Sequence, residues 1–351
     1  REALKNADVL LTRSSTQVNA DLLEGTPIRF AATATIGDDH FDKVWLENHG
    51  IAFANAAGSS TGSVIEYMIT VLLELHTRKL ISIPETALGI IGAGRIGGSF
   101  EKLCQAFGMQ VLVSDPPRQR VEGDHGFSSL DELLDQADIL SLHTPLTREG
   151  EDATWHLLNQ DRLQRFQGRG IINAGRGAVV DNEALADWLD GDASRWAVLD
   201  CWENEPAISH RLLSHSQVII ATPHIAGHSL EGKAANTQFV YDALCRYLGI
   251  DPAWDMQDHL PAPEPEVIRI ETGNDHWANL HAVVTRLYPL QHDVDALRAT
   301  AILDIASLAE AFTALRRHYP VRRAWHIPRV CFLPPHGETV QLAQVIGMRL
   351  E

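Results

Sequence analysis

The 351-residue chain carries 46 acidic and 29 basic residues, which give a formal net charge of −17 at pH 7. This negative charge opposes binding to nucleic acid and to anionic membranes, so an acidic substrate would need cations placed locally. The length predicts two or three domains, and 45% hydrophobic residues suffice for packed cores. No CxxC pair occurs among Cys104, Cys201, Cys245 and Cys331, so neither a disulfide framework nor a metal site is predicted. Reduced thiols fit a cytoplasmic protein.

Residues 1–64 are predicted to form a small α/β lobe. Apolar strands separated by short helices are expected at residues 8–12, 28–32 and 51–53. Ligands bind beyond the carboxyl ends of parallel strands, so Arg13, Ser14 and Thr35 are placed where a small ligand would lie. Ordinary turn chemistry is the alternative for each of them. The chain begins inside a helix-like stretch, and we expect a strand and a turn to precede it.

A glycine-rich turn interrupts the chain after the apolar residues 88–91. The turn contains Gly92, Gly94 and Gly97, and an amphipathic helix pattern follows it. The order of strand, glycine turn and helix predicts a dinucleotide-binding site. Free N–H groups at the start of the helix favour phosphate groups there.

An acidic residue ends the next predicted strand. Asp115 lies 18 residues after Gly97, near the spacing expected for the carboxylate that binds the adenosine ribose hydroxyls. A carboxylate there repels a 2′-phosphate and favours NAD over NADP. The nearby Arg118 leaves NADP open as an alternative.

Further strands alternate with helices after Asp115. They are predicted at residues 138–142, 170–173, 197–200 and 218–221. With the glycine turn they predict a Rossmann-type doubly wound parallel sheet over residues 65–227. A helix at 64–78 leads into this domain, and residues 228–250 return to the small lobe.

A third region follows a proline-rich, acidic linker at residues 251–266. Within 267–351 the clearest predicted element is one helix over 293–317. Its apolar stripe follows a helical period through Val294, Leu297, Ala301, Ile305, Leu308, Phe312 and Leu315. Periodicity alone leaves open whether this stripe is a subunit seam or the core of the region.

Arg176, Glu205 and His224 each follow a predicted strand. An arginine can hold a substrate carboxylate bidentately, and an imidazole can accept the hydroxyl proton as hydride leaves for a nicotinamide. A glutamate can hold the second imidazole nitrogen and favour the protonated ring. The three groups together predict oxidation of a 2-hydroxy acid.

Five segments carry a family resemblance: GAGRIG at 92–97, HTPLT at 143–147, INAGRGAVVD at 172–181, DCWENEP at 200–206 and TPH at 222–224. With these segments the chain resembles the D-isomer specific 2-hydroxyacid dehydrogenases. The resemblance implies that Arg176, Glu205 and His224 are catalytic and that the small lobe is flavodoxin-like. It also implies an α+β dimerisation domain at 267–351, and so a homodimer.

The resemblance further implies binding residues. NAD contacts are implied at Gly92, Gly94, Arg95, Ile96, Gly97, Asp115, Thr144, Ala174, Asp200 and Gly227. Contacts to a small phosphorylated hydroxy acid are implied at Arg13, Ser14, Thr35 and His228. Another member of the family, acting on 3-phosphoglycerate, hydroxypyruvate or glyoxylate, stays open as an alternative, as does a non-catalytic NAD-sensing module.

Overall fold

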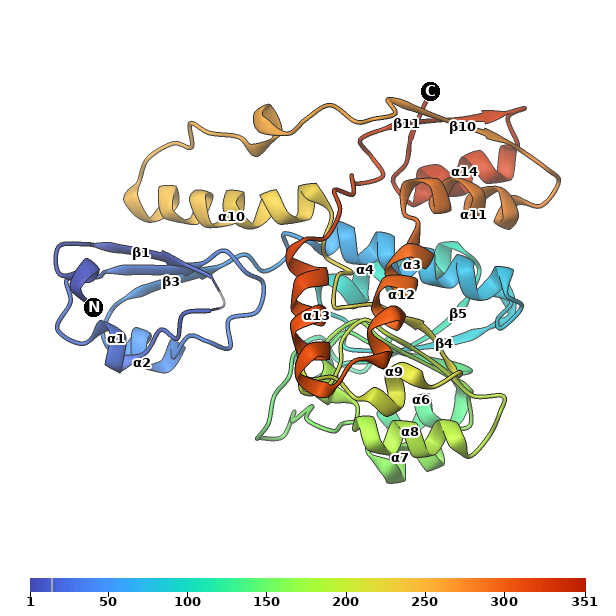
Figure 1. Cartoon of the computed structure of the whole chain (residues 1–351), viewed down its shortest axis with the longest axis horizontal. Coiled ribbons are helices and arrows are strands. Elements are labelled where there is room, and N and C mark those ends of the chain that lie inside the picture. The colour runs from blue at the N-terminus through green and yellow to red at the C-terminus, as the bar shows by residue number, and fades with distance from the viewer. Residues whose placement is uncertain (14) are drawn as a thin grey trace. The chain divides into compact units, whose positions relative to one another are not determined.

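The computed structural model describes residues 1–13 and 15–351, and Ser14 lies outside the described residues. The chain divides into two compact units (Figure 1). The first comprises Arg1–Ser63 and Gly227–Pro263, and the second Val64–Ala226 and Glu264–Glu351. The region that we assigned to a third domain, 267–351, therefore shares a compact unit with the nucleotide-binding region. No helix among the described residues is both long enough and apolar enough to span a membrane.

The first unit is a three-layered α/β lobe. Its strands are parallel in the order β1 (Val9–Thr12), β2 (Phe30–Thr33) and β3 (Ala52–Asn55). Its helices are α1 (Ala20–Leu23), α2 (Lys43–Asn48) and α10 (Leu230–Leu248). Side chains alternate across the sheet: Ala31 packs with Leu46 of α2, whereas Phe30 and Ala32 pack with Val240 of α10. The three predicted strands are confirmed, with ends shifted by one to two residues.

The second unit is built on a six-stranded parallel sheet in the order β5-β4-β6-β7-β8-β9. The strands are β4 (Ala87–Ile91), β5 (Gln110–Ser114), β6 (Ile139–Leu142), β7 (Gly170–Asn173), β8 (Trp196–Leu199) and β9 (Val218–Ala221). The strand order reverses between β4 and β6, and in such sheets ligands bind beyond the carboxyl ends of the strands at this reversal. The predicted doubly wound sheet is confirmed.

Helices cover both faces of this sheet (Figure 1). They are α3 (Thr61–Thr77), α4 (Arg95–Ala106), α5 (Pro116–Glu122), α6 (Leu130–Gln136), α7 (Gln160–Arg165), α8 (Asn182–Asp190) and α9 (His210–Ser214). Ile139 and Val198 pack on the side of α3 and α4, whereas Leu140 and Ala197 pack on the side of α6 and α8. Burial on both faces explains why these strands are continuous apolar runs in the sequence.

The end of the chain adds a second small sheet and further helices. The strands β10 (Val267–Glu271), β11 (Arg329–Leu333) and β12 (Arg349–Leu350) are parallel. The helices are α11 (His276–Leu287), α12 (Leu290–Arg298), α13 (Ile305–Arg317) and α14 (Gly337–Val345). Short 3₁₀ helices occur at Glu2–Leu4, Ile83–Glu85, Gly177–Val179, Met256–His259 and Ala299–Ile302.

The prediction of one helix over 293–317 is wrong. The chain turns between α12 and α13, because Leu303 is extended and the Asp304 side chain accepts hydrogen bonds from the N–H groups of Ala306 and Ser307. Four residues of the apolar stripe are buried: Leu297, Leu308 and Phe312 join one hydrophobic cluster of the nucleotide-binding sheet, and Val294 joins the other. This part of the stripe is core of the chain itself.

Candidate active site

The glycine turn is shaped by close backbone approach. It joins β4 to α4, and Gly92 has a φ of +88°. A Cβ on Gly97 would lie 1.9 Å from the Gly92 carbonyl oxygen, whereas a Cβ on Gly94 would meet no atom within 4 Å. Only glycine fits where the helix crosses the turn, and the surface at Gly94 is open to a ligand. The N-terminus of α4, at Arg95 and Ile96, therefore offers backbone N–H groups to a pyrophosphate.

Asp115 supports this turn from the end of β5. One of its carboxylate oxygens accepts a hydrogen bond from Ala93 N (2.8 Å), and the other accepts from Arg118 N (3.0 Å) as the N-cap of α5. The Arg118 guanidinium is itself engaged by the Glu122 carboxylate at 2.7 Å. Because Arg118 is paired with Glu122, it is less available to bind the 2′-phosphate of NADP. The pairing therefore favours NAD.

The loop after β6 contains two polar atoms that suit a cofactor. Thr144 Oγ1 and His143 Nδ1 are buried and have no hydrogen-bond partner within residues 1–13 and 15–351. Burial lowers the pKa of His143 to about 4, so its ring is neutral at physiological pH. Buried polar groups are normally satisfied, and a polar group of a bound dinucleotide could pair with these atoms. The residues present therefore fit NAD.

Replacing Asp115 with serine is expected to weaken NAD binding by about 10- to 100-fold, because a charge-assisted hydrogen bond is lost. The preference for NAD over NADP should fall as well, since the carboxylate no longer repels a 2′-phosphate. Isothermal titration calorimetry with both cofactors measures both effects. The exposed Asp161→Asn change on α7 is the control. An unchanged NAD affinity in D115S would remove Asp115 from the cofactor site.

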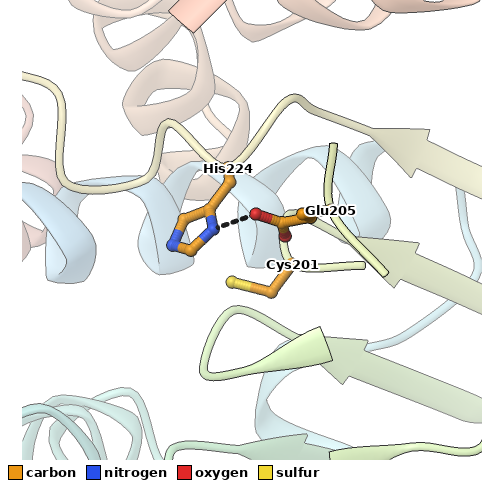
Figure 2. A group of neighbouring side chains, drawn as sticks. All are labelled: Cys201, Glu205 and His224. Atoms are coloured by element: carbon orange, nitrogen blue, oxygen red, sulfur yellow. Dashed lines mark hydrogen bonds and ion pairs between the residues drawn. The ribbon is translucent and has the colours of Figure 1, made fainter. Parts of the chain in front are cut away.

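Glu205 and His224 form a hydrogen-bonded pair at the carboxyl ends of β8 and β9. His224 Nδ1 lies 2.7 Å from Glu205 Oε2. Figure 2 shows this hydrogen bond as a dashed line. The other carboxylate oxygen accepts a hydrogen bond from Trp202 N at 2.8 Å. Because Nδ1–H donates to the carboxylate, Nε2 is the nitrogen left for a substrate. The sequence predicted both residues, and the structure brings them into contact.

A buried carboxylate holds the loop that carries His224. Asp200 is 1% exposed and accepts hydrogen bonds from Thr222 Oγ1 (2.7 Å), Ile225 N (2.8 Å) and Ala226 N (3.0 Å). These partners flank His224, whose φ of +55° is unusual for a residue other than glycine. The fixed loop accounts for this strained conformation, which is typical of functional sites. Asp200 itself, for which an NAD contact was implied, directs its carboxylate into the protein.

Arg176 follows β7, the strand next to β8. Its Nη1 donates a hydrogen bond to the Gly175 carbonyl oxygen (2.9 Å), which also accepts from the Cys201 thiol (3.3 Å). A Cβ on Gly177 would lie 1.8 Å from the Trp202 carbonyl oxygen, so the two loops pack directly on each other. Arg176, Glu205 and His224 thus end three adjacent parallel strands, and Ala174 ends the same strand as Arg176.

Opposing effects set the protonation of the His224–Glu205 pair. Burial lowers the pKa of His224, but its contact with the Glu205 carboxylate raises it, and the result is above the usual value. Burial raises the pKa of Glu205, but His224, Trp202 N and Arg316 lower it, and the result is below the usual value. Burial raises the pKa of Cys201, so this residue is a thiol. The pair is an imidazolium and a carboxylate near neutral pH.

This protonation state predicts an alkaline dependence of oxidation. Removing a hydroxyl proton needs the neutral imidazole, so kcat/KM for oxidation should rise with pH through a pKa above about 6.5, the usual value of histidine. The reverse reduction needs the imidazolium and should fall over the same pH range. Rate profiles in both directions measure this, and each serves as the control for the other. If kcat/KM for oxidation rose with pH through a pKa at or below the usual histidine value, His224 would not be the protonated residue that we infer.

The residues expected to bind substrate belong to the first unit. Arg13 follows β1 and Thr35 follows β2. Thr35 Oγ1 lies 2.7 Å from Thr33 Oγ1 and donates to the Gly37 carbonyl oxygen at 2.8 Å. His228 precedes Ser229, the N-cap of α10, and Gly227 begins the same segment. Ser14 falls outside the described residues.

Two neighbours of the His224–Glu205 pair escaped the sequence analysis. The side chain of Cys201 lies beside His224 (Figure 2). Arg316, on α13, has its Nη1 4.0 Å from Glu205 Oε2. Cys201 lies inside the DCWENEP segment but was not given a role there, and no motif marks Arg316, which lies 111 residues after Glu205 along the chain.

Comparison with known proteins places this site in a family. Residues 73–226 match the NAD binding domain of the D-isomer specific 2-hydroxyacid dehydrogenases. The chain is 41% identical over 348 residues to the erythronate-4-phosphate dehydrogenase of Pseudomonas savastanoi pv. phaseolicola, covering 99% of this chain and 91% of that protein. The chain belongs to the D-isomer specific 2-hydroxyacid dehydrogenase family.

Other relatives of this dehydrogenase agree. It is 42% identical over 334 residues to the erythronate-4-phosphate dehydrogenase of Hydrogenovibrio crunogenus, covering 95% of this chain and 86% of that protein. A solved structure of D-lactate dehydrogenase from Aquifex aeolicus, complexed with NAD and lactic acid, matches with a TM-score of 0.58 and 26% identity. That match covers 71% of this chain and 85% of the other. The predicted family, fold class and NAD cofactor are confirmed, and the roles of single residues stay predictions.

Proposed function

We propose that this dehydrogenase oxidises 4-phospho-D-erythronate to 3-hydroxy-2-oxo-4-phosphooxybutanoate with NAD, in the biosynthesis of pyridoxal 5′-phosphate. The observation that carries the proposal is the His224–Glu205 pair, which is suited to removing a hydroxyl proton. The choice of this substrate is supported by a relative that is named for it and is 41% identical over 348 residues of this chain.

The residues of the chain divide the chemistry among them. The Arg176 guanidinium holds the substrate carboxylate and polarises the oxygen at C2. His224 Nε2 accepts the C2 hydroxyl proton, and Glu205 stabilises the imidazolium that forms. When bound, NAD supplies the acceptor for the hydride that leaves C2.

The substrate phosphate needs local positive charge, because the chain carries a net charge of −17. We assign this task to the first unit, where Arg13 follows β1 and offers a guanidinium. Thr35, Ser14 and His228 supply hydroxyl and imidazole groups that can donate hydrogen bonds to substrate oxygens. The assignment predicts that the unphosphorylated acid is a poor substrate.

The proposed substrate is tested by comparing kcat/KM for erythronate 4-phosphate, 3-phosphoglycerate, erythronate and glycerate, with NAD in excess. We expect erythronate 4-phosphate to exceed erythronate and glycerate by at least about 100-fold, because these two acids lack the phosphate and its charge-assisted hydrogen bonds. It should also exceed 3-phosphoglycerate, which has a phosphate but a shorter carbon chain. Equal or faster turnover of 3-phosphoglycerate would contradict the proposal. Turnover of none of the four acids, with intact NAD binding, would favour a sensing module.

We also propose that the protein is a cytoplasmic homodimer that uses residues 267–351. Its support is apolar surface in this region: Ile302, Ile305 and Val321 are 90%, 65% and 73% exposed. Large exposed aliphatic side chains are unfavourable in water and typical of contacts between subunits. Sedimentation of the full chain and of the I302E/I305E variant tests this. A monomeric parent protein would overturn it.

A further inference from the structure

A cation from the end of the chain lies beside the catalytic pair. Arg316 is on α13, and its Nη1 lies 4.0 Å from Oε2 of Glu205, the oxygen that accepts from His224. Both residues belong to the second compact unit. Within residues 1–13 and 15–351, Glu205 is the carboxylate that Arg316 approaches as an ion pair.

The surroundings of Arg316 keep its charge near Glu205. The guanidinium lies over the Phe312 ring at 6.0 Å, one helical turn earlier on α13. Its Nε is buried and has no hydrogen-bond partner among the described residues, and its side chain is 38% exposed. An arginine with its stem packed and its head beside a single carboxylate acts mainly through its charge.

Most of the other charged or titratable groups around His224 follow β8: Asp200, Cys201 and Glu205. Tyr67 of α3 reaches the loop through Thr222, and Asp293 of α12 faces Asp200. Each of these acidic groups is either neutral or negatively charged. Two further cations lie nearby: Arg322 acts on Asp293 from the segment after α13, and Arg176 follows β7, the strand paired with β8. Arg316 is the cation that forms an ion pair with Glu205 itself among the described residues.

We propose that Arg316 is a positioning residue of the active site, which keeps Glu205 ionised and oriented and limits how strongly His224 holds its proton. A positive charge beside the pair disfavours every protonated form in it. Without Arg316, His224 retains its proton to higher pH, and less of the enzyme carries the neutral imidazole needed for oxidation. This inference rests on the proposed role of His224 as the proton acceptor.

The test is the pKa of His224 in variants of the full chain, measured by NMR with ¹³C-labelled histidine and assigned with H224N. Arg316→Gln should raise this pKa by about 0.5 to 1 pH unit, a discounted effect for a partly exposed charge. Arg316→Lys should restore most of the parent value. Arg317→Gln, at the exposed next residue, is the matched control and should change nothing.

Kinetics give a second readout. In R316Q the acidic limb of kcat/KM for oxidation should move to higher pH by the same amount, with the affinity for NAD unchanged. An unshifted pKa in a folded R316Q, or an equal shift in R317Q, overturns the proposal. A raised KM for substrate without a shifted limb also overturns it and places Arg316 on the substrate. The NMR titration needs no substrate. It therefore tests the role of Arg316 even if the proposed substrate is wrong.

Discussion

Replacing His224 with asparagine is expected to lower kcat for oxidation by about 10²- to 10⁴-fold, the usual contribution of a general base. Asparagine cannot accept the hydroxyl proton. NAD affinity should be retained, because the glycine turn, Asp115 and Thr144 lie on the other strands of the sheet. Single-turnover kinetics and calorimetric titration with NAD separate these two effects.

The matched control for H224N is His125→Asn, in an exposed loop of the same unit. It should leave both kcat and NAD affinity at the parent values. Parent turnover in H224N would remove His224 from the mechanism and, with it, the proposed oxidation. A joint loss of NAD binding would instead show that His224 supports the fold of the cofactor site.

Replacing Arg322 with methionine is expected to lower the free energy of unfolding by about 3 to 5 kcal/mol, because it leaves a buried carboxylate without its cation. Arg322 Nη1 lies 2.8 Å from Glu66 Oε2, and both residues are less than 10% exposed. Trp325 N donates to the other carboxylate oxygen at 2.7 Å. The pair therefore joins α3 to the segment after α13. Urea unfolding followed by tryptophan fluorescence measures the loss.

A double-mutant cycle identifies the source of this loss. Glu66→Gln with Arg322→Met removes both charges, and the double variant should be more stable than R322M alone. The exposed Arg317→Met change controls for the loss of any arginine. A surface ion pair usually contributes up to about 1 kcal/mol. If the free energy of unfolding of R322M fell by less than this, the buried ion pair would not stabilise the fold as we expect.

Arg322 also links stability to the active site. Its Nη2 donates to the Ala226 carbonyl oxygen at 3.3 Å, and Ala226 N is held by Asp200 in the loop that carries His224. Deleting residues 267–351 would remove this support together with Leu308 and Phe312 of the core. Such a truncated chain should lose its fold.

The nucleotide-binding sheet was readable from the sequence because its signals are local. The inner strands β6, β7 and β8 are fully buried and are therefore mostly apolar runs. The glycine turn and Asp181, the N-cap of α8, act within a few positions. The strand β10 was missed. Its alternation, with Ile268 and Ile270 buried and Arg269 and Glu271 exposed, is that of a half-buried strand, but it was not used. The strands β11 and β12 were missed as well.

The sequence alone determined the class of the fold, the cofactor turn and the candidate chemistry of Arg176, Glu205 and His224. These depend on apolar periodicity and on motifs whose residues are close along the chain. Only the tertiary structure decided where α12 ends, that α13 buries Leu308 and Phe312 within its own chain, and that Arg322 meets Glu66. The physical reason is that such contacts join residues far apart in sequence, and local pattern carries no information about which distant side chains folding brings together.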